Sequence, residues 1–173
     1  TMRDYALNDA YTVLCESYRN EVIETLGLDA ADAHIYAIEN AERVIEDVCY
    51  AKENVVLFCG RFENWSKRVD RLLRIWAKVE PIIPDWRLVL VGDGRDGKML
   101  RSLASELKLE RVSFEGMHRD VTGYYRKASI VCLSSETEGW PLALTEGQAQ
   151  GCIGVAFGVT SGIREILGGD CVF

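Results

Sequence analysis

Two glutamates, Glu138 and Glu146, flank a short loop that precedes a run of small residues. The loop contains Gly139 and Pro141. Proline suits the first position of a helix, because the N–H that it lacks would have no partner there. A helix that starts here presents free backbone N–H groups, which attract anions. One glutamate then lies just before the helix and the other about one turn inside it, so we expect both carboxylates to face one cleft.

Two cations lie on an earlier loop, residues 60–67, which follows an apolar run. The planar guanidinium of Arg61 suits a pair of phosphate oxygens, and Lys67 adds a compact positive charge. The net charge of −7 argues against a nucleic-acid partner but permits an anionic small ligand beside a local pair of cations. Taken alone, these two side chains are more simply explained as solvated groups at a helix start.

A third loop, residues 92–97, reads Gly-Asp-Gly-Arg-Asp-Gly and matches the G-x-G-x-x-G pattern of dinucleotide-binding loops. Glu115 follows at about the spacing at which that pattern places an acidic residue. Asp93 and Asp96, however, would repel a pyrophosphate at close range. The pattern also normally opens its domain, whereas here another strand and helix precede it. An NAD(P)-type dinucleotide-binding domain is therefore the alternative interpretation.

Apolar runs alternate with helical patterns from residue 51 onward. Continuous apolar runs are typical of strands buried on both faces of a parallel sheet, and apolar residues at 3.6-residue spacing predict helices. The alternation predicts an α/β fold with a mostly parallel sheet flanked by helices, and such sheets bind ligands at the carboxyl ends of their strands. The expected strands are residues 54–60, 87–91, 112–114 and 128–133, with another that starts within residues 148–157. The expected helices are 67–79, 97–109, 121–127, one from about 142, and one that starts over residues 161–166.

The first 50 residues carry no motif chemistry, and we interpret His34 as structural. Strands are expected at residues 11–15 and 33–38, and helices at 18–26 and 41–48. At the other end, residues 168–173 are expected to begin one more strand.

The length, composition and cysteine content of the chain limit the classes of protein to which it can belong. A chain of 173 residues with 48% hydrophobic residues indicates one globular domain, or one domain plus a fragment. Six cysteines without C-x-x-C spacing indicate free thiols in a reducing compartment. The first residues lack signal-peptide character, and no apolar run approaches the ~20 residues of a membrane span. We therefore expect a cytoplasmic location.

The segment Glu138-Gly139-Trp140-Pro141-Leu142, followed by Glu146-Gly147-x-Ala149-x-Gly151, resembles the Glu-x7-Glu segment of the retaining family 4 (group 1) glycosyltransferases, which have the two-domain GT-B architecture. Gly60-Arg61 with Lys67 six residues on resembles the family's diphosphate clamp, although Arg68 stands where the family usually has glycine. The Gly-Asp-Gly at residue 92 resembles the family's tight turn near the donor site.

The resemblance implies a Rossmann-like C-terminal domain that binds a UDP- or GDP-sugar, needs no metal or other cofactor, and retains the configuration of the transferred sugar. It gives Glu146 the ribose hydroxyls and places Glu138 near the donor sugar. It makes the backbone of Met117 and His118 candidate base contacts, although His118 fits a surface histidine equally well. Two carboxylates alone would also fit a glycosidase, but that chemistry has no use for the cation loop. The implied catalytic residues are Glu138, Arg61 and Lys67, and the implied donor-binding residues are Gly60, Arg61, Lys67, Gly92, Met117, His118, Glu138, Gly139, Trp140, Pro141, Leu142 and Glu146.

The resemblance also implies a domain division. Residues 1–50 would be the end of an N-terminal domain and the connection to the next, and residues 51–173 a nucleotide-sugar-binding domain truncated at its C-terminus. The acceptor site of such enzymes lies mostly on the N-terminal domain, so we expect this chain alone to be inactive. Cell-surface glycan synthesis, with the full-length enzyme peripherally associated with the inner face of the cell membrane, is the implied setting. A non-catalytic α/β module is a further alternative.

Overall fold

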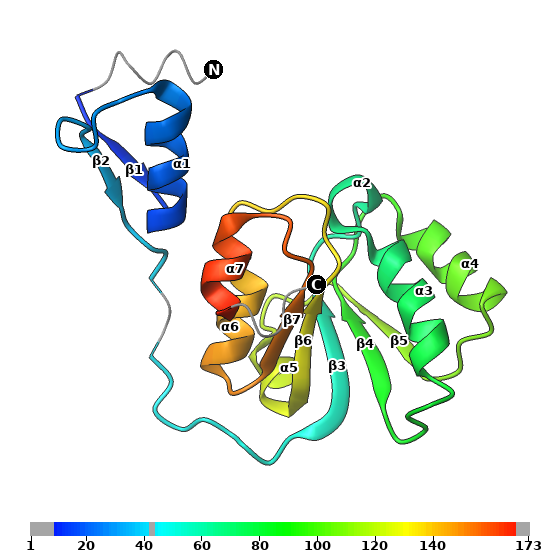
Figure 1. Ribbon diagram of the computed structural model, residues 1–173. Coiled ribbons are helices and arrows are strands. Elements are labelled where there is room, and N and C mark those ends of the chain that lie inside the picture. Colours follow the sequence, from blue (N-terminus) through cyan, green and yellow to red (C-terminus); the bar gives the residue numbers. More distant parts are fainter. Residues whose placement is uncertain (1–8, 42–43, 169–173) are drawn as a thin grey trace.

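The computed structural model describes residues 9–41 and 44–168 of the chain. Its main body is a sheet of five parallel strands in the order β5-β4-β3-β6-β7, which confirms the predicted α/β fold (Figure 1). The strands are β3 (Glu53–Cys59), β4 (Arg87–Val91), β5 (Val112–Gly116), β6 (Ala128–Leu133) and β7 (Ile153–Ala156). The helices are α2 (Asn64–Lys67), α3 (Val69–Val79), α4 (Gly97–Glu106), α5 (Thr122–Lys127), α6 (Leu142–Ala149) and α7 (Ser161–Leu167).

The core lies where the helices cover the sheet. The central strands β3, β4 and β6 are almost wholly apolar, as expected for strands that are buried on both faces. Helix α3 meets the sheet with apolar residues at helical spacing, because that spacing brings them onto one side of the helix. The buried residues of α3 are Val69, Leu72, Leu73 and Trp76.

The order of the strands creates a topological switch point. From β3 the chain moves outward through β4 to β5, and it then returns across the sheet to β6 on the other side of β3. The loops that leave β3 and β6 therefore run in opposite directions from neighbouring strands, at the carboxyl edge of the sheet. Open α/β sheets bind their ligands at such a switch point.

A smaller unit precedes the main body. It consists of β1 (Tyr11–Val13), α1 (Glu16–Leu26) and β2 (Ile35–Ala37), and the two strands pair in parallel. An extended segment joins it to β3 (Figure 1). Helix α1 packs against α7 of the main body. No helix within residues 9–41 and 44–168 is long and apolar enough to cross a lipid bilayer.

Two predicted helices differ from the structure. Residues 44–48 of the helix expected at 41–48 are not helical, and Val44 is 85% exposed. A helix this short is not stable without extensive packing, and here only Ile45 and Val48 lie near the main body, beside Glu146 and Gly151. The helix expected at 67–79 is broken at Arg68, which has a φ of 47°, so α2 and α3 are separate. The strand expected at residues 168–173 falls outside the described residues apart from Gly168.

Candidate functional site

Lys67 and Glu138 meet at the switch point. Lys67 is the last residue of α2, and Glu138 lies in the loop between β6 and α6. The ammonium of Lys67 donates to both carboxylate oxygens of Glu138, at 2.7 and 2.9 Å. The hydroxyl of Ser135 also donates to Glu138, at 2.6 Å. The side chain of Lys67 is 21% exposed and that of Glu138 is 7% exposed, so this ion pair is shielded from much of the solvent.

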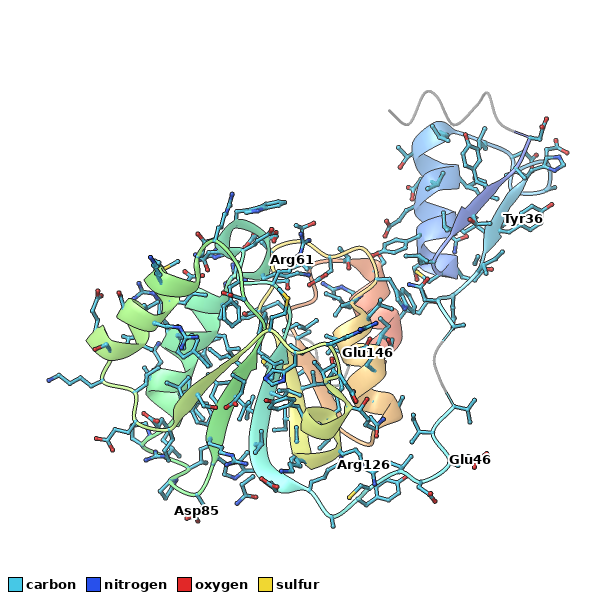
Figure 2. All side chains as sticks on the ribbon, turned by 180° about the vertical axis from the view of Figure 1, so that it is seen from behind. Tyr36, Glu46, Arg61, Asp85, Arg126 and Glu146 are labelled. Atoms are coloured by element: carbon cyan, nitrogen blue, oxygen red, sulfur yellow. The ribbon has the colours of Figure 1, made fainter. Side chains whose placement is uncertain are left out.

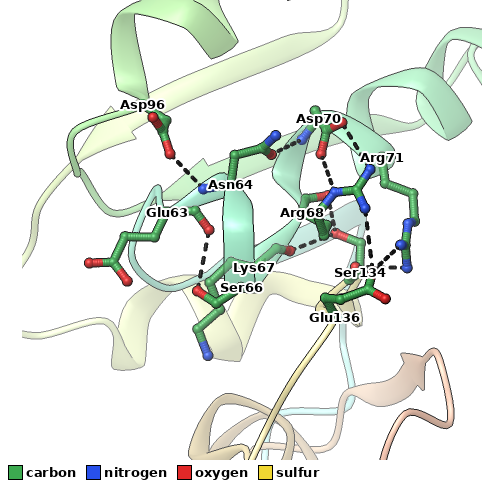
Figure 3. A network of polar contacts seen from close by, with 10 residues as sticks. All are labelled: Glu63, Asn64, Ser66, Lys67, Arg68, Asp70, Arg71, Asp96, Ser134 and Glu136. Carbon is green, nitrogen blue, oxygen red and sulfur yellow. Dashed lines mark hydrogen bonds and ion pairs between the residues drawn. The ribbon is translucent and has the colours of Figure 1, made fainter.

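Further contacts join the segments that carry this pair. The backbone N–H of Glu136 donates to the carbonyl of Ser66 at 2.7 Å. The hydroxyl of Ser134 donates to the carbonyls of Lys67 and Arg68, at 3.2 and 2.9 Å (Figure 3). Because these bonds involve the backbone, they set the position of Lys67 relative to the loop after β6.

Arg68 adopts the left-handed backbone conformation that glycine usually supplies, and its side chain is held from two sides. Its guanidinium pairs with Asp70, with the closest nitrogen and oxygen 3.0 Å apart, and with Glu136 at 3.3 Å. Arg71 pairs with the same carboxylate of Glu136 (Figure 3). The ion pairs of Arg68 offset part of the cost of this backbone conformation, which glycine would adopt more easily.

Arg61 does not join the pair. Its side chain is 72% exposed, and its guanidinium lies 3.3 Å from the carboxylate of Glu63 on the same loop. Figure 2 shows Arg61 on the loop at the carboxyl edge of the sheet. Of the two cations expected to converge beside Glu138, only Lys67 is in contact with it.

The glycines of the loop after β4 are explained by a close approach of two backbones. A Cβ on Gly92, whose φ is 138°, would lie 1.9 Å from the carbonyl oxygen of Gly60. A Cβ on Gly94 would lie 2.7 Å from the carbonyl oxygen of Phe62. The pattern that resembles a dinucleotide fingerprint therefore serves to seat this turn against the loop after β3. Gly60 and Gly92 share that contact, which supports the segment leading to Lys67.

Glu146 has a separate partner. The hydroxyl of Tyr125 donates to its carboxylate at 2.9 Å. Burial, together with the nearby Cys59 and Glu146, raises the pKa of Tyr125, so its hydroxyl stays protonated and remains a donor. A hollow of about 280 Å³ adjoins the pair and is lined by Tyr125, Glu146, Gln150 and the turn before α5. Sequence reasoning did not single out Tyr125, because its place opposite Glu146 depends on how α5 packs beside α6.

Met117 and His118 follow β5 at the same edge of the sheet. The side chain of Met117 is 77% exposed. The Nε2 atom of His118 lies 3.1 Å from both the carbonyl oxygen of Glu115 and the hydroxyl of Tyr124. The side chain of His118 thus has protein partners of its own.

Helix α6 begins at residue 142, as expected, but the proline before it is not its first residue. Pro141 is the capping residue, and Leu142 is the first residue of the helix. The carbonyl of Gly139 accepts a hydrogen bond of 2.7 Å from the hydroxyl of Tyr18. The indole N–H of Trp140 is buried and has no hydrogen-bond partner among the described residues.

The described part of the chain contains no candidate metal site and no disulfide. Among residues 9–41 and 44–168, no three His, Cys, Asp or Glu side chains are grouped as they would be to hold a metal ion. The five cysteines in these ranges are all free thiols, and Cys171 lies outside the described residues.

Comparison with known proteins identifies the family. Residues 53–172 match the family described as "Glycosyl transferases group 1". An uncharacterized glycosyltransferase of Haemophilus influenzae is 39% identical over 137 residues, which cover 78% of this chain and 38% of that protein. The amylovoran biosynthesis glycosyltransferase AmsD of Erwinia amylovora is 27% identical over 175 residues, which cover 96% of this chain and 48% of that protein. The chain thus spans less than half the length of these relatives.

The fold agrees with this assignment. A crystal structure of a TarM mutant of S. aureus, in complex with fondaparinux, α-GlcNAc-glycerol and UDP, superposes with a TM-score of 0.84 at 18% identity. The superposition covers 95% of this chain and 33% of TarM. The fold is therefore that of the Rossmann-like half of a GT-B enzyme. On the strength of the match over residues 53–172, the chain belongs to the group 1 glycosyltransferase family.

Proposed function

We propose that this chain is the donor-binding domain of a retaining glycosyltransferase that takes a sugar from a UDP-sugar without a metal ion. The observation that carries the proposal is the ion pair of Lys67 and Glu138 at the switch point of a group 1 chain. A shielded ammonium beside a carboxylate is suited to a ligand that has both an anionic diphosphate and a hydroxyl-rich sugar. UDP is chosen because the similar TarM structure contains it.

The leaving diphosphate gains negative charge as the sugar departs, and it is stabilised by fixed positive groups. Lys67 supplies one such group, and the N–H groups at the very start of α6, beginning with Leu142, supply others. Arg61 is exposed and paired only within its own loop, so its long side chain can turn toward a bound diphosphate. We assign Lys67, Arg61 and Glu138 to the reaction, with Glu138 orienting Lys67 and facing the transferred sugar.

The nucleoside is assigned to the neighbouring elements. Glu146 already accepts one hydrogen bond from Tyr125, and a carboxylate has room for two ribose hydroxyls as well. The backbone of Met117 and His118 would contact the base, and Gly60 and Gly92 would let the backbone approach the donor. Gly139, Trp140 and Pro141 complete the donor loop.

The whole enzyme extends beyond this chain in the proposal. Residues 1–50 belong to the end of an acceptor-binding domain and its connection, and residues 51–173 bind the donor. Catalysis requires closure of the two domains, so this chain alone binds the donor without transferring it. The name of AmsD supports a role in polysaccharide biosynthesis. We place the full-length enzyme at the cytoplasmic face of the cell membrane, held there peripherally.

Calorimetric titration with UDP, GDP, ADP and NAD tests the proposal. We expect UDP to bind most tightly and Lys67→Ala to weaken it by at least about tenfold, as for loss of a charge-assisted hydrogen bond. Lys98→Ala is the matched control, because Lys98 is exposed on α4. Preferential binding of NAD, or UDP binding that is indifferent to Lys67, would refute the assignment.

A further inference from the structure

The donor loop is tied to the N-terminal unit by one hydrogen bond. The hydroxyl of Tyr18, in α1, donates to the carbonyl of Gly139 at 2.7 Å, across 121 positions of sequence. Tyr18 lies outside the matched range of residues 53–172, and no sequence pattern distinguishes it. The bond joins a segment without motif chemistry to the loop that follows Glu138.

A third element closes around this bond. Gly162 is in the first turn of α7 and is buried. A Cβ at this position would lie 2.8 Å from the Tyr18 hydroxyl oxygen and 3.2 Å from the Gly139 carbonyl oxygen. Tyr18, Gly139 and Gly162 therefore form a junction, which we call the tyrosine junction, with no space for a side chain at position 162.

Flanking contacts hold α1 in place. The backbone N–H and the hydroxyl of Ser17 donate to the carboxylate of Glu165 on α7, at 3.3 and 2.6 Å. The hydroxyl of Ser161 donates to the carboxylate of Glu21. Because these contacts lie next to the tyrosine junction on both helices, they fix the position of α1 relative to α7, and with it the position of the Tyr18 hydroxyl relative to the loop.

The bond also restrains the peptide group that follows Gly139. The carbonyl of Gly139 and the N–H of Trp140 belong to one planar peptide group, so fixing the carbonyl fixes the direction of the N–H. Gly139 has no side chain to restrain it, and a Cβ there would meet nothing within 4 Å. Glycine is the residue with the greatest backbone freedom, so the loop needs an external restraint at this point.

We propose that Tyr18 is a positioning residue, which reaches from the N-terminal unit to fix the Gly139–Trp140 peptide so that its N–H faces the diphosphate of the donor. The proposal rests on the proposed function for its ligand, a nucleoside diphosphate. It means that the N-terminal side of the chain sets the affinity of the donor site without touching the donor.

The first test needs no ligand. Tyr18→Phe removes only the hydroxyl, and Tyr36→Phe, at an exposed tyrosine of β2, is the same change elsewhere in the unit. Amide hydrogen exchange over residues 138–142 is expected to speed up about three- to tenfold in Tyr18→Phe and to stay unchanged in Tyr36→Phe. Exchange that is equal in both variants would overturn the restraint.

The second test uses UDP. Tyr18→Phe is expected to weaken UDP binding about three- to tenfold, while the variant still unfolds cooperatively in urea and loses no more stability than one hydrogen bond contributes. Gly162→Ala is expected to weaken UDP binding more when it is made in the wild type than when it is made in Tyr18→Phe. In Tyr18→Phe the hydroxyl that the new Cβ would clash with is absent. Faster exchange with unaltered UDP affinity would overturn the donor role of the tyrosine junction. If the wild-type chain does not bind UDP, the proposed function fails and the donor role fails with it, while the exchange result still decides the restraint.

Discussion

The ammonium of Lys67 lies 2.7 Å from the carboxylate of Glu138, although 71 positions separate the two residues in the sequence. They come from the loops that leave β3 and β6, which are neighbouring strands on either side of the switch point. Removing either partner from a shielded ion pair leaves the other charge uncompensated. The two residues should therefore have opposite effects on the binding of an anion.

Glu138→Gln should raise the affinity for UDP, because it leaves an ammonium in the crevice that no carboxylate neutralises. Lys67→Ala should lower that affinity, because an unpaired carboxylate then faces the diphosphate. We expect a gain of about threefold in the first variant and a loss of about 10- to 100-fold in the second, measured by calorimetry. Changes of the same sign in both variants would show that the pair does not face the diphosphate.

Substitutions of Arg68 test whether the residue between α2 and α3 has a left-handed backbone conformation. Arg68→Gly and Arg68→Ala remove the same ion pairs, but only glycine adopts a φ of 47° at little cost. The glycine variant should be more stable than the alanine variant by about 1 kcal/mol in urea unfolding. If alanine is as stable as glycine, the break in the helix is not maintained in solution.

Gly92→Ala should strongly destabilise the fold. Its φ of 138° and the 1.9 Å approach to the carbonyl of Gly60 leave no room for a Cβ, so we expect a loss of about 3 kcal/mol or more in urea unfolding. Gly123→Ala is the control: it lies in α5 with open space around it, and there alanine should stabilise by about 0.5 kcal/mol. A Gly92→Ala variant of wild-type stability that had lost only NAD binding would restore the dinucleotide interpretation.

Cys132 should resist alkylation. Burial in β6 raises the pKa of its thiol to about 12, and the thiolate is the reactive form. With iodoacetamide at pH 8, mass spectrometry should find Cys49, on the extended segment, labelled well before Cys132. Equal labelling rates under native conditions would contradict the packing of β6.

The contact of α1 with α7 should weaken in acid. The hydrogen bond from Ser17 lowers the pKa of Glu165 below its ordinary value. A lowered pKa contributes stability that is present at neutral pH and is lost as the pH falls through the lowered value. The difference in unfolding free energy between wild type and Glu165→Gln should therefore shrink between about pH 5 and pH 3. A difference that grows toward acid pH would have the wrong sign for this contact.

The helices and strands of the main body follow from local patterns that the sequence contains. Apolar runs such as residues 87–91 and the helical spacing from Val69 to Val79 identify buried elements, because burial depends on the period of the side chains. Alternation of strands and helices then implies a parallel sheet with ligand loops at its carboxyl edge. The same reasoning fails at residues 44–48, where a helical pattern is too short to form a helix without extensive packing.

Which side chains contact each other could be seen only in the tertiary structure. The sequence indicated that Lys67 and Glu138 lie at the same edge of the sheet, but only the folded chain joins them and turns Arg61 toward Glu63 instead. The partners Tyr125 and Tyr18 are likewise set by helices that pack from distant parts of the chain. Local periodicity determines which residues are buried, whereas a contact between two side chains depends on the packing of all the elements around them.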